Sequence, residues 1–152
     1  MNILVINGHP DPESYCSALS HAYAAGAKKT GAQIQKLELS KIAFDPNLKY
    51  GYHKRIELEK DLAEAQKLIC WADHLVFVYP TWSCPDRFLT KIIAVLKGFF
   101  DRVFLPGFAY KYRENSPLWD KLLKGKTAHL IVTMDTPSWY NRIVTGGPAI
   151  SS

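Results

Sequence analysis

The sequence has few cysteines and no long apolar run. Its three cysteines, Cys16, Cys70 and Cys84, are widely spaced and form no C-x-x-C pair. Their number and spacing argue against a disulfide framework and a zinc site, and they indicate a reducing, cytoplasmic setting. No apolar stretch approaches the roughly 18 residues of a membrane span, and the N-terminus lacks the pattern of a signal peptide. We therefore expect no metal site and no membrane span.

Two common phosphate-binding motifs are also missing. The chain contains neither the G-x-G-x-x-G of dinucleotide-binding loops nor the G-x-x-x-x-G-K-[ST] of P-loops. The net charge is +5, but the lysines and arginines are scattered, so the sequence predicts no nucleic-acid partner. A length of 152 residues with 47% hydrophobic residues predicts one globular domain over residues 1–152.

Strand signals alternate with helix signals along the chain. This order predicts an α/β fold with a doubly wound parallel sheet in strand order 2-1-3-4. The expected strands are residues 2–7, 33–39, 74–79 and 127–134, and the expected helices are residues 15–30, 56–71 and 88–104. Residues 44–47, Phe-Asp-Pro-Asn, are expected to form a turn.

The first strand leads through a polar loop into the first helix. Ser14 is the expected N-cap, and the first-turn N–H groups of a helix have no partner inside it. Together with the helix dipole, these groups make an anion site. The loop has no Lys or Arg but does hold Asp11 and Glu13, so a bound phosphate would depend on backbone N–H groups and the hydroxyls of Ser14 and Ser17.

In a doubly wound sheet, the loops after the first, third and fourth strands meet at one edge. The second of these loops carries Trp82, and the third carries Trp139 and Tyr140. An anion site beside aromatic side chains suits a phosphorylated planar cofactor, for which FMN is the obvious candidate. The alternative is that Trp82 and Trp139 simply cap the sheet.

Four stretches of the chain carry a resemblance. They are Ile-Asn-Gly-His-Pro at residues 6–10 with Ser-Tyr-Cys-Ser at 14–17, Tyr-Pro-Thr-Trp at 79–82, Ala-Val-Leu-Lys-Gly-Phe-Phe-Asp-Arg-Val-Phe at 94–104 with Gly-Phe-Ala-Tyr at 107–110, and Thr-Met-Asp-Thr-Pro-Ser-Trp-Tyr at 133–140. Together they resemble the flavodoxin-like NAD(P)H:quinone oxidoreductase family, which includes DT-diaphorase and the bacterial quinone reductases.

The resemblance implies a flavodoxin-like fold, bound FMN (or FAD), and ping-pong hydride transfer from NAD(P)H through the flavin to a quinone. It implies that the phosphate and ribityl end is held by His9, Ser14, Tyr15, Cys16 and Ser17. It implies that the flavin ring is bordered by Pro80, Thr81, Trp82, Thr133, Asp135 and Thr136. Tyr140 would donate a hydrogen bond to developing flavin charge, and Tyr110 and Tyr112 would reach into the active site of a partner in a homodimer.

The sequence departs from the family pattern in two places. After Trp82 the usual loop glycine is replaced and several residues are added, and the chain stops soon after the fourth strand. The fifth strand and last helix are therefore expected to be missing, which would leave the fourth strand as an open edge. One alternative is a shortened, catalytically impaired relative that acts as a regulatory partner, as in potassium-efflux ancillary subunits. Another is that both departures are artefacts of the gene sequence.

Several single residues have less specific interpretations. Cys70 is expected in the core and His129 in the core or at an edge, and Cys16 is expected to pack or to contact the flavin. Asp101 and Arg102 are expected to form a pair on the helix surface or a dimer contact. The sequence does not distinguish NADH from NADPH, and it does not identify the quinone.

Overall fold

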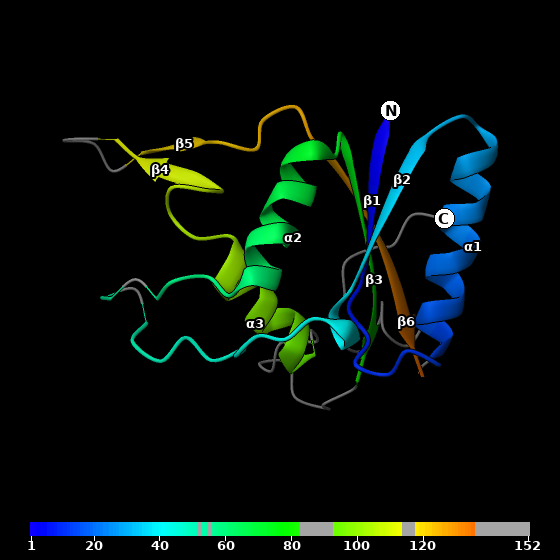
Figure 1. Ribbon diagram of the computed structural model, residues 1–152, viewed down its shortest axis with the longest axis horizontal. Helices are drawn as coiled ribbons and strands as arrows, with labels where there is room; N and C mark the ends of the chain where they lie inside the picture. The colour runs from blue at the N-terminus through cyan, green and yellow to red at the C-terminus, as the bar shows by residue number, and fades with distance from the viewer. Residues whose placement is uncertain (52, 55, 83–92, 114–117, 136–152) are drawn as a thin grey trace, which may run out of the picture.

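The computed structural model describes residues 1–51, 53–54, 56–82, 93–113 and 118–135. Strands and helices alternate along most of this chain, which confirms the expected α/β class (Figure 1). The elements are β1 (Asn2–Asn7), α1 (Tyr15–Lys29), β2 (Gln33–Glu38), a 3-10 turn (Leu39–Lys41), α2 (Lys60–Trp71), β3 (His74–Thr81), α3 (Ala94–Val103), β4 (Tyr110–Tyr112), β5 (Trp119–Lys121) and β6 (Thr127–Met134).

Four of the strands form a parallel sheet in the order β2-β1-β3-β6. Since β6 is the fourth strand expected from the sequence, the predicted order 2-1-3-4 is confirmed. The central strands β1 and β3 are buried over most of their length. Burial on both faces explains why their sequences are continuous apolar runs and do not alternate.

Helices cover both faces of the sheet (Figure 1). Successive side chains of a strand point to opposite faces, so β1 contributes to two hydrophobic cores. Leu4 and Ile6 pack in the core that contains residues of α2 and α3, and Ile3 and Val5 pack in the core beneath α1. Because the four strands of the sheet are parallel, their carboxyl ends all lie at one edge.

Arg102 is buried, and the expected surface pair with Asp101 does not form. The residue is 1% exposed. Its guanidinium donates to both oxygens of the Glu59 carboxylate, at 3.1 and 2.6 Å. It also donates to the Asp45 carbonyl oxygen at 2.6 Å. Asp101 instead accepts a hydrogen bond from Lys97 at 2.6 Å. The expected place of Arg102 on the helix surface is wrong, because its side chain points inward and binds the segment before α2 to α3.

The same contacts explain where α2 begins. The sequence predicts a helix over residues 56–71, but α2 starts at Lys60. Glu59 has extended backbone, and the Glu57 carbonyl oxygen accepts a hydrogen bond from Arg102 at 3.3 Å. These bonds hold the residues before Lys60 outside the helix. The other long predicted helix, residues 88–104, corresponds to α3 from Ala94 to Val103, and residues 88–92 lie outside the described part of the chain.

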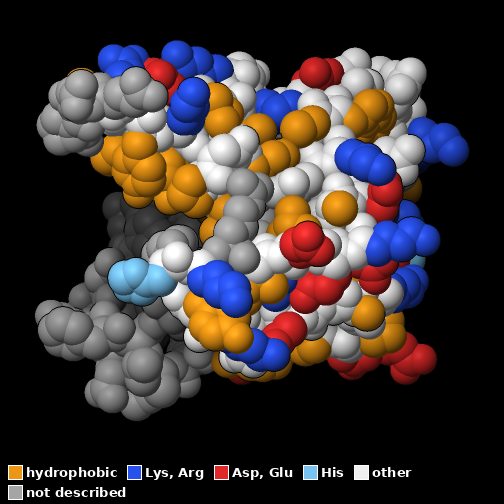
Figure 2. Space-filling model, turned by 60° about the vertical axis from the view of Figure 1, so that its left-hand side comes forward, with side chains coloured by type: hydrophobic (Ala, Val, Ile, Leu, Met, Phe, Trp, Pro, Cys, Tyr) orange, Lys and Arg blue, Asp and Glu red, His pale blue; other side chains and the backbone are white. Residues whose placement is uncertain are grey.

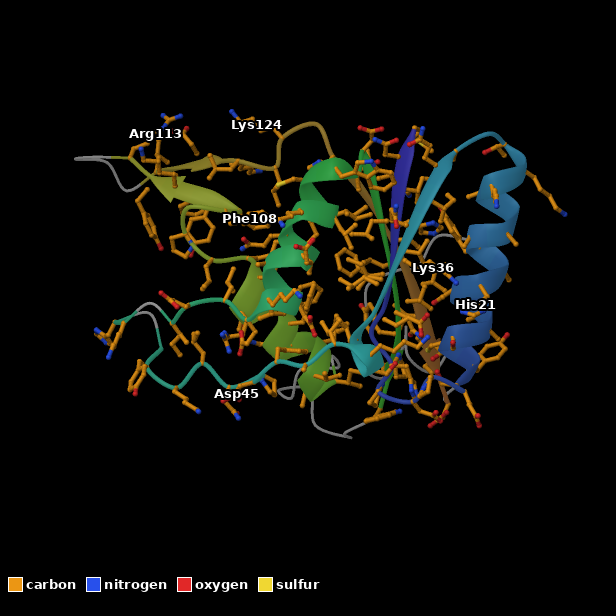
Figure 3. All side chains as sticks on the ribbon, viewed as in Figure 1. His21, Lys36, Asp45, Phe108, Arg113 and Lys124 are labelled. Atoms are coloured by element: carbon orange, nitrogen blue, oxygen red, sulfur yellow. The ribbon has the colours of Figure 1, made fainter. Side chains whose placement is uncertain are left out.

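The segment over residues 42–48 passes directly across α3. A Cβ placed on Gly98 would lie 2.3 Å from the Cβ of Pro46, so only glycine fits at this crossing. The Asp45 carboxylate accepts the Asn47 backbone N–H at 2.9 Å. The backbone turn predicted at residues 44–47 lies instead at residues 48–51, where the Gly51 N–H donates to the Leu48 carbonyl oxygen at 2.9 Å. Figure 3 shows Asp45 beside α3, on the opposite side of the sheet from α1.

Two features of the remaining chain were not expected. β4 and β5 form a separate antiparallel hairpin, and Cys70 is exposed and not in the core. β6 pairs with β3, and in the described ranges no strand pairs with its other edge. Leu130 in β6 is 55% exposed, so its side chain is largely uncovered on its face of the sheet.

No helix in the described ranges is both long and apolar enough to cross a membrane. The same ranges contain no group of three or more side chains that could together bind a metal ion.

Candidate functional site

A cavity of about 580 Å³ lies at the carboxyl edge of the sheet. It forms where the loop after β1 meets the ends of β3 and β6, at the lower edge of the sheet in Figure 1. Open α/β sheets bind their ligands at such an edge, where the strand order reverses. The cavity is lined by His9, Tyr15, Cys16, Leu19, Pro80, Trp82, Val132, Thr133, Met134 and Asp135.

The loop after β1 is held by side chains that accept backbone N–H groups two residues further on. Asn7 Oδ1 accepts the His9 N–H at 3.1 Å, and His9 Nδ1 accepts the Asp11 N–H at 2.9 Å. Asp11 Oδ1 in turn accepts the Glu13 N–H at 2.9 Å. The loop therefore uses these N–H groups to fix its own shape, and they are not available to a ligand.

The remaining donors lie at the start of α1. Ser14 is the N-cap, and its Oγ accepts the Ser17 N–H at 3.3 Å. The N–H groups of Tyr15 and Cys16 have no hydrogen-bond partner among the described residues. Since the prolines of the loop have no N–H, an anion at this end would be bound by the first turn of α1 and by hydroxyl protons. The backbone donors of the predicted anion site are therefore the N–H groups of Tyr15 and Cys16, and not those of the loop before them.

Gly8 lets the loop leave β1 close to the sheet. Its N–H donates to the Val78 carbonyl oxygen at 2.8 Å. A Cβ at Gly8 would lie 3.0 Å from Leu96 Cδ2 and 3.2 Å from Tyr79 Cβ, so a larger residue would have to displace one of them. The close approach fixes the start of the loop against β3 and α3.

Two side-chain contacts join the walls of the cavity. Cys16 is buried, and its Sγ lies 3.3 Å from Thr133 Oγ1, which connects α1 to β6. On the other wall, the rings of His9 and Trp82 meet edge to face with centroids 5.8 Å apart. Trp82 lines the cavity and is 56% exposed. No Lys or Arg side chain lines the cavity within the described ranges.

The structure brings most of the predicted site residues together. His9, Tyr15, Cys16, Pro80, Trp82, Thr133 and Asp135 line the cavity. Ser14, Ser17 and Thr81 are not among the lining residues: Ser14 is the N-cap of α1, Ser17 is in its first turn, and the Thr81 hydroxyl donates to the Thr133 carbonyl oxygen at 3.3 Å. Thr136 and Tyr140, and also Trp139, lie outside the described residues.

Tyr110 and Tyr112 are not part of this cavity. They belong to the β4–β5 hairpin, which lies beyond α2 and α3 from the end of β6 (Figure 1). Figure 3 shows the same separation, with Arg113 of the hairpin on the opposite side of the molecule from His21 of α1. Their predicted role in the site of a partner chain stays a prediction.

Sequence reasoning missed several residues at this site. Leu19, Val132 and Met134 line the cavity, and Asn7 holds the loop. Asn7 is 2% exposed, and its Nδ2 has no hydrogen-bond partner in the described residues. A polar residue at the carboxyl end of an otherwise apolar strand is the signal that could have identified Asn7.

A smaller cavity of about 210 Å³ lies on the other side of the sheet, between the segment before α2 and the end of α3. It is lined mainly by apolar side chains, among them Leu48, Ile56 and Leu105. Arg102 also borders it, but the guanidinium already binds Glu59 and two carbonyl oxygens. The larger cavity is the better candidate because it lies at the strand ends and has unpaired donors.

Comparison with known proteins agrees with this geometry. A family model described as the flavodoxin-like fold matches residues 1–149. Among solved structures, Smu.1420 from Streptococcus mutans is 34% identical, with a TM-score of 0.69 over 95% of this chain and 73% of that one. An NAD(P)H:quinone oxidoreductase from Methanothermobacter marburgensis shares the fold, with a TM-score of 0.75 at 24% identity over 93% of this chain and 71% of that one.

Curated relatives carry redox names. NAD(P)H dehydrogenase [quinone] 1 from Cavia porcellus is 28% identical over 86% of this chain and 52% of its own length. The ribosyldihydronicotinamide dehydrogenase-like protein traD from Penicillium crustosum is 28% identical over 88% of this chain and 57% of its own length. The present chain thus spans little more than half the length of these relatives.

Proposed function

Because this chain belongs to the family with the flavodoxin-like fold, we propose that it binds FMN in the cavity at the strand ends and acts as an NAD(P)H:quinone oxidoreductase. We infer NAD(P)H and a quinone as the redox substrates from the names of relatives such as NAD(P)H dehydrogenase [quinone] 1. We infer the flavin from the flavodoxin-like fold and from a similar solved structure, an FMN-dependent NADH-azoreductase from Bacillus anthracis in complex with FMN.

The observation that carries the proposal is the division of the cavity into an anion-binding end and an aromatic end. The unpaired Tyr15 and Cys16 N–H groups at the start of α1 suit the phosphate. The open indole of Trp82 suits a planar ring. A volume of about 580 Å³ is in the range of cofactor pockets. The residues present therefore fit a phosphorylated flavin.

Each part of the site has a definite task in this proposal. When bound, the flavin would supply the redox chemistry, accepting a hydride from NAD(P)H and then reducing a quinone by two electrons in a ping-pong cycle. The first turn of α1 would hold the phosphate, and the contact between Cys16 and Thr133 would keep α1 and β6 at a fixed spacing. Trp82 and Pro80 would cover the ring and exclude water.

We also propose that the protein is a homodimer in which the β4–β5 hairpin contributes to the site of the partner chain. Tyr112 and Trp119 on the hairpin are 60% and 56% exposed. Figure 2, which turns the hairpin side toward the viewer, shows hydrophobic side chains at the surface among lysines and arginines. Exposed aromatic residues of this kind are typical of interface cores.

Binding of FMN to two variants tests the cofactor site. Trp82→Ala removes the open aromatic surface, and we expect FMN to bind about 5- to 30-fold more weakly, since loss of one aromatic stacking contact costs about 1–2 kcal/mol. Tyr50→Ala is the matched control, because Tyr50 is similarly exposed at 53% but lies outside the cavity. Flavin fluorescence quenching measures both dissociation constants. Equal affinities in the two variants would contradict the proposed ring position.

A further inference from the structure

The histidine of the loop after β1 has only one nitrogen available to a ligand. His9 Nδ1 accepts the backbone N–H of Asp11 at 2.9 Å. A nitrogen that accepts a hydrogen bond carries no proton, and a neutral imidazole has one donor and one acceptor nitrogen. The proton of His9 therefore resides on Nε2.

The position of the ring directs this N–H toward the cavity. His9 lines the cavity, and its Nδ1 side is turned back to its own loop. Within the described part of the chain, Nε2 has no hydrogen-bond partner. The edge-to-face contact with Trp82, at 5.8 Å and 88°, limits rotation of the ring. An N–H donor is thus held at the wall between the start of α1 and the aromatic end.

The hydrogen bonds on both sides of His9 keep the loop in this arrangement. Asn7 accepts the His9 N–H, and Asn7 is buried at the end of β1. The Asp11 carboxylate accepts the Glu13 N–H and so fixes the backbone from which the Asp11 N–H is donated. Pro10 and Pro12 limit the loop further, because each proline ring fixes one backbone dihedral angle.

We infer that the backbone N–H of Asp11 sets the tautomer of His9, and that His9 thereby acts as a neutral Nε2–H donor to the anionic end of the cofactor. This inference rests on the proposed function for the identity of the ligand, but the tautomer itself is a property of the ligand-free chain. Asp11 is a positioning residue, since it acts on the ligand through His9. The site would then bind a phosphate group without a cationic side chain from the described residues.

Nitrogen-15 NMR of ligand-free protein tests the tautomer directly. With 15N-labelled histidine, and His9→Gln to assign the signal, we expect His9 to show a protonated Nε2 and an unprotonated Nδ1 at neutral pH. Asp11→Ala keeps the backbone N–H and should retain this pattern. Asp11→Pro removes the N–H and should give a mixture of the two tautomers. A wild-type His9 that is protonated on Nδ1 would overturn the inference, even if Asp11→Pro failed to fold.

FMN titration tests the consequence for binding. His9→Phe keeps a ring but has no donor, and we expect about 10- to 100-fold weaker binding, as for loss of a hydrogen bond to a charged group. His9→Gln places an amide N–H near the former Nε2 and should stay within about threefold of wild type. Equal loss in the Gln and Phe variants would overturn the donor role. If wild-type protein bound neither FMN nor FAD, the proposed function would fail while the NMR result on the tautomer would stand.

Discussion

At the scale of single residues, two arginines form ion pairs in opposite surroundings. The Arg102 side chain is 2% exposed and binds Glu59, whereas the Arg113 side chain is 53% exposed and binds Asp120. Water solvates an exposed pair almost as well when it is broken, so such a pair adds little stability. In the other pair Arg102 is buried but the Glu59 side chain is 34% exposed, so loss of Arg102 would leave a carboxylate that water solvates only in part.

Replacing each arginine by methionine should separate these two cases. Arg102→Met removes the guanidinium from the Asp45 carbonyl oxygen and from the Glu59 carboxylate, which keeps its bond from the Asp45 backbone N–H at 3.2 Å. We expect it to lower the free energy of unfolding by about 2 kcal/mol, less than the roughly 3–5 kcal/mol of a fully buried pair because water reaches the Glu59 carboxylate. Arg113→Met, the control, should change it by less than about 1 kcal/mol. Urea unfolding monitored by tryptophan fluorescence measures both, and similar losses in the two variants would contradict the role given to Arg102.

The carboxylates of the same segment predict a loss of stability in acid. Hydrogen bonds from the Asn47 backbone and from Lys49 lower the pKa of Asp45 to about 2. Partial burial alone would raise the pKa of Glu59, but bonds from the backbone N–H groups of Glu59 and Asp45 and from Arg102 outweigh this and leave it lowered. A folded-state pKa below the unfolded one gives stability that is present near neutral pH and lost as pH falls through the folded value.

We therefore expect the free energy of unfolding to decrease from about pH 4 toward pH 2, the range between the unfolded and folded pKa values of Asp45. Asp45→Asn cannot titrate there and should show a shallower decrease, although its side-chain oxygen can still accept the Asn47 N–H. Urea unfolding at a series of pH values measures the slope. An unchanged slope in Asp45→Asn would show that this carboxylate is not coupled to folding.

At the scale of elements, the strands were easier to predict than the helix ends. β1 and β6 have the predicted bounds: β1 is an apolar run between Asn2 and Asn7, and β6 starts at Thr127 and ends just before Asp135. The predicted start of α2 was wrong because it depends on the contact between Glu59 and Arg102. These residues are 43 positions apart, and the local spacing of apolar residues does not report such a contact. Pro80, Trp82 and Thr133 were predicted at the cavity wall. The apolar residues Val132 and Met134 were not, because an apolar residue near the end of a strand looks like any other core residue in the sequence.

Two helical glycines predict opposite effects of the same substitution. Gly98→Ala in α3 would place a Cβ against Pro46, and we expect it to destabilise the protein by about 1–3 kcal/mol. A Cβ placed on Gly26 in α1 would meet no atom within 4 Å outside its own helix. Gly26→Ala should stabilise by up to about 1 kcal/mol because alanine favours the helix. Thermal unfolding followed by circular dichroism measures both shifts, and a tolerated Gly98→Ala would contradict the close crossing at Pro46.

At the scale of the whole molecule, the sheet separates two surfaces with different proposed tasks. The cavity opens at the strand ends between α1 and β6, and the hairpin lies beyond α2 and α3 (Figure 1). A single chain therefore does not bring Tyr110 and Tyr112 to its own cavity. The domain extent, the dimer and the cytoplasmic location stay predictions, while the α/β architecture and the strand order are confirmed.

The dimer proposal makes a prediction about the hairpin surface. Trp119→Glu places a charge on an exposed aromatic position of β5, and we expect it to convert a dimer into monomers. Tyr50→Glu is the control, since Tyr50 is exposed on a different segment, before α2. Size-exclusion chromatography with light scattering measures the mass of each. A wild-type monomer, or a dimer that both variants leave intact, would contradict the proposed interface.

The most direct test of the central claim is the amount of flavin bound per chain. Purified protein is mixed with excess FMN, the unbound flavin is removed, and the remaining flavin is quantified from its absorption spectrum. If the cavity is a flavin site, each chain should retain about one FMN, or one FAD when that nucleotide is supplied. Folded protein that stays colourless with both nucleotides would contradict the account.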